Sequence, residues 1–315
     1  DDQKSRYLQP LLECKVASCY SMTEPQAGSD PAEFTCSAQR EGEEWVINGE
    51  KWFASHARFA EFLLVMVVTN PERPVHEGAS IILIDKDAPG LEIVRNSAVG
   101  PYVEQGNGVH AYLRFTDCRV PAENLLGEEG KGFLVAQTRL GGGRIHHAMR
   151  SVGVLKKAMD MMCERVLSRT TKGELLANKQ FTQEKISDTY TQIMQYRLHV
   201  LYTAWLIDKY KEYNREVRKE IAAIKAATPK ILQDVIYRAM HMHGSLGMSD
   251  ELPFMNMWAN IPELGIVDGP TEVHKVTVAR SVLRDYAPTN DLFPTYHVPV
   301  QYESAMKKYG HYLES

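Results

Sequence analysis

A carboxylate on an apolar turn near the end of the chain is the residue best suited to proton chemistry. Asp268 follows Ile266 and Val267 and precedes Gly269-Pro270. Such a carboxylate can remove a proton from the carbon next to a carbonyl if a dry site raises the pKa of its carboxyl group. Aspartate also commonly caps a turn or a helix without taking part in chemistry. The sequence therefore offers Asp268 as a candidate base and leaves the structural role open.

Two segments nearer the N-terminus combine small, hydroxyl and aromatic residues. Residues 20–30, YSMTEPQAGSD, could present backbone N–H groups and hydroxyls to an anion or a heteroaromatic ring, although loops of this kind are commonly plain surface turns. Residues 48–55 open with an Asn-Gly hairpin signal and place Phe53 and Ser55 on a predicted strand. Core packing, with Trp52 and Phe53 on opposite faces of that strand, explains the second segment equally well.

Three later segments carry glycine and basic residues. Glycines 141–143 lead into a long predicted helix, whose start could bind an anion or simply pack closely. The basic turn at Arg169 could hold a phosphate through its guanidinium, or lie exposed. Gly244 and Gly247 are expected to end a helix. The adjacent His146 and His147 lack the spacing of metal ligands, so no metal site is expected.

The elements that must position these residues form a β unit followed by helices. Short β-type segments separated by turns run from about Thr35 to Phe115, which favours antiparallel strands. After Gly127 the pattern is helical, and Pro229 should kink one helix without ending it. A last helix is expected from Thr271. We predict an α+β fold: an antiparallel β-barrel or sandwich domain at residues 1–130, a C-terminal four-helix-type bundle at 131–288 and an extended tail at 289–315.

Composition argues against several classes of protein. Lys and Arg total 36 against 40 Asp and Glu, without a dense basic run, so no nucleic-acid partner is expected. The longest apolar run, residues 62–68, is shorter than the roughly 20 residues of a membrane span. Five dispersed cysteines without a CxxC pair indicate reduced thiols and no zinc site. Localisation stays open between a bacterial cytoplasm and the mitochondrial matrix or peroxisome of a eukaryote.

Taken from the N-terminus to the C-terminus, these segments resemble the motifs of the acyl-CoA dehydrogenase family and occur in the same order. The family reads aromatic-x-x-Thr-Glu-Pro-x-Ala-Gly-Ser-Asp at residues 20–30 and Asn-Gly-x-Lys-x-Trp-x-Thr at residues 48–55. Its catalytic Glu, in Glu-Gly-Thr-x-[Glu or Gln], aligns with Asp268, which is one methylene shorter. Asp-Gly-Pro-x-Glu-Val-His and Arg-Ile-His-His look like the branch of the animal family members ten and eleven. The positions that depart from the common motifs are Gln26, Phe53, Ser55, Lys172, His241 and Ser245.

The resemblance implies a flavoprotein with FAD as its cofactor. Asp268 would take the α proton of the substrate, and Arg144 would support the loop that carries it. The positions aligned with substrate contacts are Ser29, Arg144, Asp268 and Gly269. The positions aligned with cofactor contacts are Tyr20, Met22, Thr23, Ser29, Phe53, Ser55, Arg169, Thr171, Gln180, His241, Gly244, Ser245, Thr271 and Glu272. The stretch from Arg169 would reach the FAD of a neighbouring subunit.

The implied reaction is the α,β-dehydrogenation of an acyl-CoA to a trans-2-enoyl-CoA, as in fatty-acid β-oxidation. An electron-transfer flavoprotein would accept the electrons, and the protein would form a homodimer or homotetramer. Three rival functions stay open: an acyl-CoA oxidase, which would share these motifs, a catalytically impaired acyl-CoA-binding or assembly protein, and an unrelated β-plus-helix interaction module. The N-terminal helical third of the family fold is expected to be missing from these residues.

Overall fold

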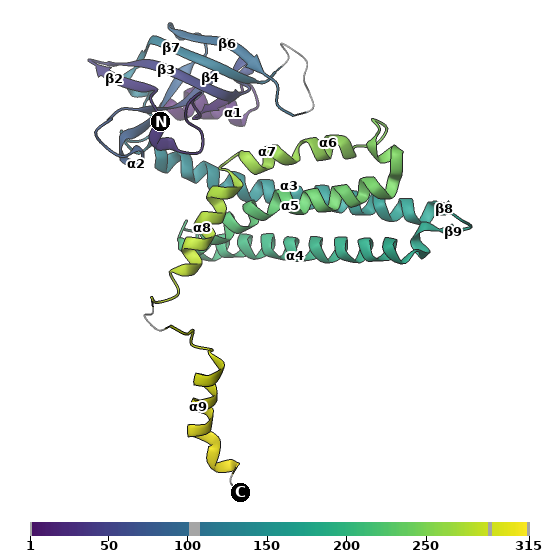
Figure 1. Cartoon of the computed structure of the whole chain (residues 1–315). Helices are drawn as coiled ribbons and strands as arrows, with labels where there is room; N and C mark the ends of the chain where they lie inside the picture. Colours follow the sequence, from purple (N-terminus) through teal and green to yellow (C-terminus); the bar gives the residue numbers. More distant parts are fainter. Residues whose placement is uncertain (1, 101–107, 289–291, 314–315) are drawn as a thin grey trace. The chain divides into compact units, whose positions relative to one another are not determined.

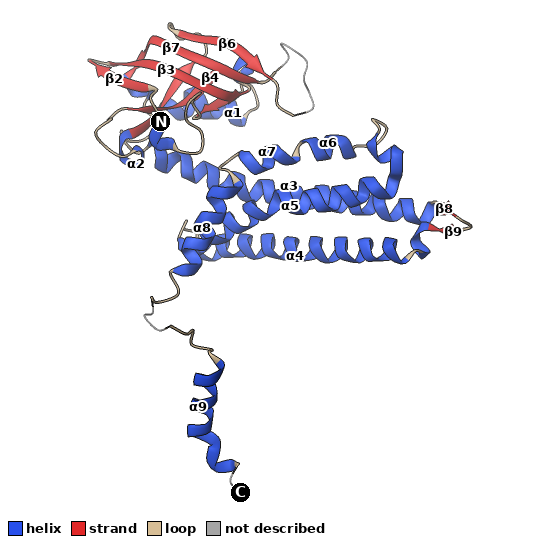
Figure 2. Ribbon diagram, viewed as in Figure 1, coloured by secondary structure: helices blue, strands red, loops and turns tan. Residues whose placement is uncertain are grey.

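The computed structural model of the 315-residue chain describes residues 2–100, 108–288 and 292–313. The chain divides into two compact units, Asp1–Val278 and Ala279–Ser315. The first unit holds a curled β-sheet followed by long helices (Figures 1 and 2). This arrangement confirms the predicted α+β fold. The domain boundaries within the first unit stay predictions.

Seven strands form one sheet in the order β1-β4-β2-β3-β7-β6, with β5 on the other side of β4. Their bounds are β1 Ser18–Ser21, β2 Ser37–Glu41, β3 Glu44–Ser55, β4 Phe62–Val68, β5 Ala79–Asp85, β6 Leu91–Ser97 and β7 His110–Pro121. Short helices precede or interrupt them: α1 Gln9–Leu12 and α2 Val75–Gly78. Most pairs are antiparallel, as predicted, but β4 pairs in parallel with β1 and, at Ser37–Val68, with β2. The parallel pairing of β1 and β4 arises because the β2–β3 hairpin lies between them in sequence and returns the chain in the same direction.

The hairpin predicted at Asn48-Gly49 is wrong, because β3 runs straight through this pair. The turn between β2 and β3 instead lies at Gly42-Glu43, next to the Glu41–Glu44 pair. Gly49 has φ 133°, and a Cβ added there would lie 2.6 Å from the Cα of Cys36. The Asn48 amide accepts from the Asp117 N–H, where the pairing of β3 with β7 is irregular. The glycine thus serves a close approach of two strands and not a reversal of the chain.

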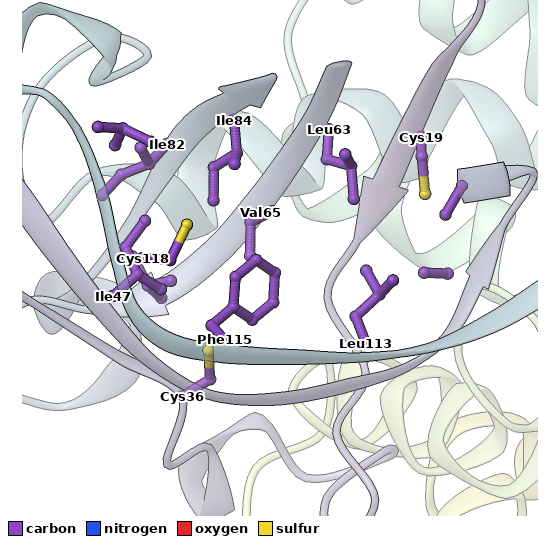
Figure 3. Packing of buried hydrophobic residues seen from close by; sticks show 14 of the residues in the cluster. Cys19, Cys36, Ile47, Leu63, Val65, Ile82, Ile84, Leu113, Phe115 and Cys118 are labelled. Carbon is purple, nitrogen blue, oxygen red and sulfur yellow. The ribbon is translucent and has the colours of Figure 1, made fainter. Parts of the chain in front are cut away.

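The continuous apolar run of β4 has two buried faces. Leu63, Val65 and Val67 point into the interior of the curled sheet, where Figure 3 shows Leu63 and Val65 among Ile82, Ile84, Leu113 and Phe115. On the opposite face, Met66 packs in a cluster that includes Ala136 of the first long helix. Strands buried on both faces need apolar residues at every position, which accounts for a run without alternation.

Helices build the rest of the first unit, and the last of them, α8, continues past the boundary of this unit at Val278. Their bounds are α3 Gly132–Ser168, α4 Gln180–Tyr210, α5 Arg215–His243, α6 Phe254–Ala259, α7 Ile261–Ile266 and α8 Thr271–Leu283. A small hairpin, β8 Thr170–Thr171 with β9 Glu174–Leu175, joins α3 to α4. Helices α3, α4 and α5 share an apolar core with α6 and α7. As predicted, α5 continues through Pro229 and ends at Gly244, which has φ 63°. Glycines 141–143 lie inside α3, nine to eleven residues after its first residue, and not before it.

The second unit contains helix α9, Val298–Tyr309, where an extended tail was predicted. Pro299 stands in the first turn, where proline is compatible with a helix, and no residue after it breaks the pattern. Residues 289–291, at the start of the predicted tail, lie outside the described residues. No helix in the described ranges is both long and apolar enough to cross a bilayer.

A buried ion pair holds the segment after β1 against β3. The Lys51 ammonium lies 2.7 Å from the Glu24 carboxylate, and the side chains are 0% and 1% exposed. Lys51 also donates to the Met22 carbonyl at 2.9 Å, while the Thr35 and Cys36 N–H groups donate to Glu24. Burial raises the pKa of Glu24, but the charge and hydrogen bond of Lys51 outweigh burial and hold this pKa below its ordinary value. Residues 20–30 are therefore anchored from inside.

Replacing Lys51 by Met should lower the free energy of unfolding by about 3–5 kcal/mol, because Glu24 stays buried without its cation. Lys86→Met is the matched control, since the Lys86–Glu61 pair has the same 2.7 Å separation but is half exposed. The control should change the free energy of unfolding by less than about 1 kcal/mol. Urea denaturation of both variants measures the difference, and equal losses would contradict the anchoring role of Lys51.

Candidate active site

Asp268 lies in a sharp turn between α7 and α8. Its φ is 55°, and that of Gly269 is 104°. Aspartate tolerates the left-handed region better than most residues, but two successive positive φ angles need support from the surroundings. A Cβ at Gly269 would lie 2.9 Å from the Nε2 atom of His274, so only glycine fits there.

Two side chains hold the backbone of this turn through one carbonyl oxygen. The Nε–H of Arg144 donates to the Asp268 oxygen at 2.8 Å, and the Nε2–H of His274 donates to the same atom at 3.2 Å. Both side chains are buried. Burial and the charge of Arg144 lower the pKa of His274 to about 4, so this imidazole is neutral at pH 7. The turn is thus fixed by one buried cation and one neutral ring.

Lys225 extends this support to the end of α7. Its ammonium donates to the Leu264 carbonyl, and the side chain is buried. The Thr271 hydroxyl donates to the next carbonyl, that of Gly265, at 3.3 Å. The last carbonyls of a helix have no partner within it, so these contacts satisfy groups that would otherwise be buried alone. Lys225 was not among the site residues expected from the sequence. The available signal was a lysine four residues after Ile221, on the inward face of a predicted helix.

The carboxylate of Asp268 faces α3. It is 13% exposed, with Oδ2 at 3.5 Å from the His147 Nε2 and Oδ1 at 3.8 Å from an Arg139 guanidinium nitrogen. Burial alone raises the pKa of Asp268. The hydrogen bond and charge of His147 and the charges of Arg139 and Arg144 outweigh burial, so the pKa lies below its ordinary value. The raised pKa expected from the sequence is therefore wrong for this structure, because the apolar turn packs against a cationic helix face.

Arg139 links this carboxylate to the loop of residues 20–30. Its guanidinium lies over the Tyr20 ring, 4.6 Å from the ring centroid. Burial raises the pKa of Tyr20 to about 12, so the phenol is neutral, and its hydroxyl donates to the Met22 sulfur at 3.5 Å. The Thr23 carbonyl accepts from the Trp52 N–H at 2.9 Å. Tyr20, Met22 and Thr23 are thus brought towards Asp268 and β3, whereas Ser29 is exposed in the loop.

Phe53 and Ser55 lie at an irregularity of β3. The register in which β3 pairs with β7 shifts between Lys51 and Ala54. Phe53, within this shift, has φ 56°. Its ring stacks on Trp52 with centroids 5.0 Å apart and an angle of 6°, so the expected placement on opposite faces is wrong. The Phe53 side chain is 48% exposed. The Ser55 hydroxyl lies 2.9 Å from the His110 Nδ1. A strained backbone thus presents a flat apolar ring beside a hydroxyl, which suits contact with a heteroaromatic ring.

The remaining predicted cofactor residues lie far from Asp268. Arg144 and Ser168 are on the same helix, and 24 residues at 1.5 Å each separate them by roughly 36 Å. Figure 1 shows the β8–β9 hairpin and the end of α5 at the same end of the helices. The predicted cofactor residues at this end are all exposed: Arg169, Thr171, Gln180, His241, Gly244 and Ser245. Thr271 and the exposed Glu272 lie instead at the start of α8, close to Asp268 in sequence.

Comparisons with known proteins agree with this arrangement. The family model for the acyl-CoA dehydrogenase middle domain matches residues 19–118, and that for the C-terminal domain matches residues 130–283. The chain is 40% identical over 286 residues to "Probable acyl-CoA dehydrogenase FadE2" of Mycobacterium tuberculosis, covering 90% of this chain and 69% of that protein. The chain belongs to the acyl-CoA dehydrogenase family.

Further members of the acyl-CoA dehydrogenase family support the branch and the fold. The chain is 39% identical to acyl-CoA dehydrogenase family member 11 of Gallus gallus, over 90% of this chain but only 37% of that protein. Butyryl-CoA dehydrogenase of Megasphaera elsdenii superposes with a TM-score of 0.80 at 28% identity, covering 90% of this chain and 72% of that one. The chain therefore spans about two thirds of the mycobacterial relative and little more than a third of the avian one.

The buried ammonium of Lys225 makes the stability depend on pH. Burial lowers the pKa of Lys225 from 10.5 to about 8. Between these two values the unfolded chain holds this proton and the folded chain releases it, so raising the pH favours the folded state. The parent should therefore gain stability relative to Lys225→Met as the pH rises from 8 towards 10. Denaturant unfolding at several pH values measures the gain, and a constant difference between the two proteins would contradict it.

Proposed function

We propose that the protein catalyses the α,β-dehydrogenation of an acyl-CoA thioester, with FAD as cofactor and Asp268 as the base. The observation that carries the proposal is the placement of Asp268. Its backbone is held by two buried side chains, and its carboxylate is mostly shielded from solvent, 3.5 Å from His147 and 3.8 Å from Arg139. A base held in this way loses little freedom on reaction, which favours proton transfer. Family membership gives the class of reaction.

The residues at the irregularity of β3 fit the proposed cofactor. The half-exposed Phe53 ring and the Ser55 hydroxyl would lie against the flavin ring, with Tyr20, Met22 and Thr23 on the loop beside it. Bound FAD would supply the acceptor for the hydride that leaves the β carbon. An electron-transfer flavoprotein as the final acceptor, and a homodimer or homotetramer, are parts of the same proposal.

The residues of this chain prepare the proton transfer. Because the pKa of Asp268 lies below its ordinary value, the carboxylate is charged at neutral pH and ready to accept a proton. Its strength as a base is modest, so the α carbon must be made more acidic by polarising the thioester carbonyl. The backbone N–H of Asp268 is the donor that we propose for that carbonyl. Ser29, Arg144 and Gly269 are proposed to shape the substrate side.

Replacing Asp268 by Asn should lower the rate of flavin reduction by acyl-CoA by about 10²–10⁴-fold, because the base is lost while the turn keeps its shape. The rate is measured as bleaching of the flavin band under anaerobic conditions, with acyl-CoAs of several lengths. Asp160→Asn is the control, since Asp160 is exposed and pairs with Lys156 on the outer surface of α3. It should bleach like the parent.

Three outcomes would count against the proposal. Bleaching that is unchanged in Asp268→Asn would exclude this residue as the base. A protein that binds acyl-CoA but no FAD would favour a binding or assembly role. Rapid peroxide production in air would favour an acyl-CoA oxidase over a dehydrogenase.

We further propose that the residues around Arg169 serve the cofactor of a second subunit. Ser168, next to Arg169, lies roughly 36 Å along α3 from Arg144, which binds the Asp268 carbonyl. The residues around Arg169 are therefore too far from Asp268 to share one FAD with it. Arg169 offers a guanidinium that can bind a phosphate with two hydrogen bonds. In a symmetric dimer, each site would then combine Asp268 of one subunit with Arg169 of the other.

Co-expression of two inactive variants tests this arrangement. Asp268→Asn lacks the base, and Arg169→Ala should lose FAD. Half of the dimers formed at random are mixed, and one of their two sites keeps both residues, so about a quarter of the parent's activity should return. Flavin reduction by acyl-CoA measures the recovery. If each site were built from one chain, the mixture would show no activity.

A further inference from the structure

One face of α3 is shaped to receive the side chain of Asp268. Gly143 and His147 are four residues apart, so they lie on the same face one turn from each other. A Cβ at Gly143 would lie 2.8 Å from the Asp268 Oδ2, whereas a Cβ at the adjacent Gly142 would meet nothing within 4 Å. The missing side chain at Gly143 is what lets the carboxylate approach the His147 Nε2, at 3.5 Å.

The second ring nitrogen of His147 limits the states that this imidazole can adopt. Nδ1 is buried and has no hydrogen-bond partner among the described residues. A proton on Nδ1 would leave an N–H group buried without an acceptor, which costs more than an unused lone pair. The proton of the neutral ring therefore belongs on Nε2, the atom that faces Asp268. A carboxylate accepts such a hydrogen bond well.

We propose that His147 is a positioning residue for Asp268, whose Nε2–H donates to Oδ2 and turns the carboxylate towards α3. This inference rests on the proposed role of Asp268 as the base. Several more groups act on the carboxylate: Arg139 and Arg144 of α3, Lys225 of α5, His274 of α8 and Tyr20 of β1. Of these, Arg144 and His274 bind the backbone oxygen and Lys225 binds Leu264, so they do not orient the carboxylate.

The pH dependence of flavin reduction separates this role from a structural one. Without the donor, the pKa of Asp268 should rise, so the base becomes protonated at higher pH. His147→Ala in the FAD-loaded protein should therefore move the acid limb of the rate profile upwards by about one pH unit, with little change at pH 8. His147→Gln, which keeps an amide donor at similar reach, should restore most of the profile. His146→Gln is the control, because His146 is exposed.

A second variant tests the geometry without touching the imidazole. Gly143→Ala should push the carboxylate away from His147 and shift the acid limb in the same direction. Gly142→Ala, which adds the same methyl group to open space, should leave the limb in place. A Gly142→Ala profile that moves as far as that of Gly143→Ala would show that the shift comes from the helix and would overturn the inference.

Nitrogen-15 NMR of the histidine rings tests the tautomer independently of activity. The signal that is lost in His147→Gln should show a proton on Nε2, the atom that faces Asp268. A ring that carries its proton on Nδ1 alone would overturn the inference, as would an unmoved acid limb in His147→Ala. The proposed function fails separately, if Asp268→Asn still reduces the flavin at the parent's rate.

Discussion

The carbonyl oxygen of Asp268, bound at once by Arg144 and His274, is the constraint on which the site depends. Both donors are buried, so each would lose its hydration without compensation if this acceptor were absent. Because the oxygen is held from two sides, the residue can stay in the left-handed region with Gly269 after it. In the structure the side chain points towards α3, where His147 and Arg139 lie.

The same arrangement gives the carboxylate two roles. Lys225, Arg144 and Arg139 bring three cations close to Asp268, which acts as their counterion. Buried charge is tolerated only when it is balanced, so the candidate base also contributes to the structure. The low pKa of Asp268 follows from this balance. A stronger base would require fewer cations and would leave the turn more loosely held.

How much the sequence could predict differs between chemistry and geometry. The fold class, the long helices and the position of Asp268 followed from periodicity and from motif order. The hairpin at Asn48-Gly49 failed because the same dipeptide also serves a close approach of strands, here against Cys36. The pKa of Asp268 was misjudged because its neighbours on α3 are about 125 residues away in sequence and follow from no local pattern. Lys225 was overlooked because a lysine is normally read as exposed.

The glycines of α3 give the longest helix a weak point beside the candidate base. Each glycine inside a helix costs about 1 kcal/mol relative to alanine, and residues 141–143 supply three in succession. Backbone amides in such a stretch open more often than those in the rest of a packed helix. Leaving aside the two ends of the helix, hydrogen exchange along α3 should therefore be fastest at these glycines. The helix face that receives Asp268 is thus also the part of α3 that can open locally while the rest of the helix stays packed.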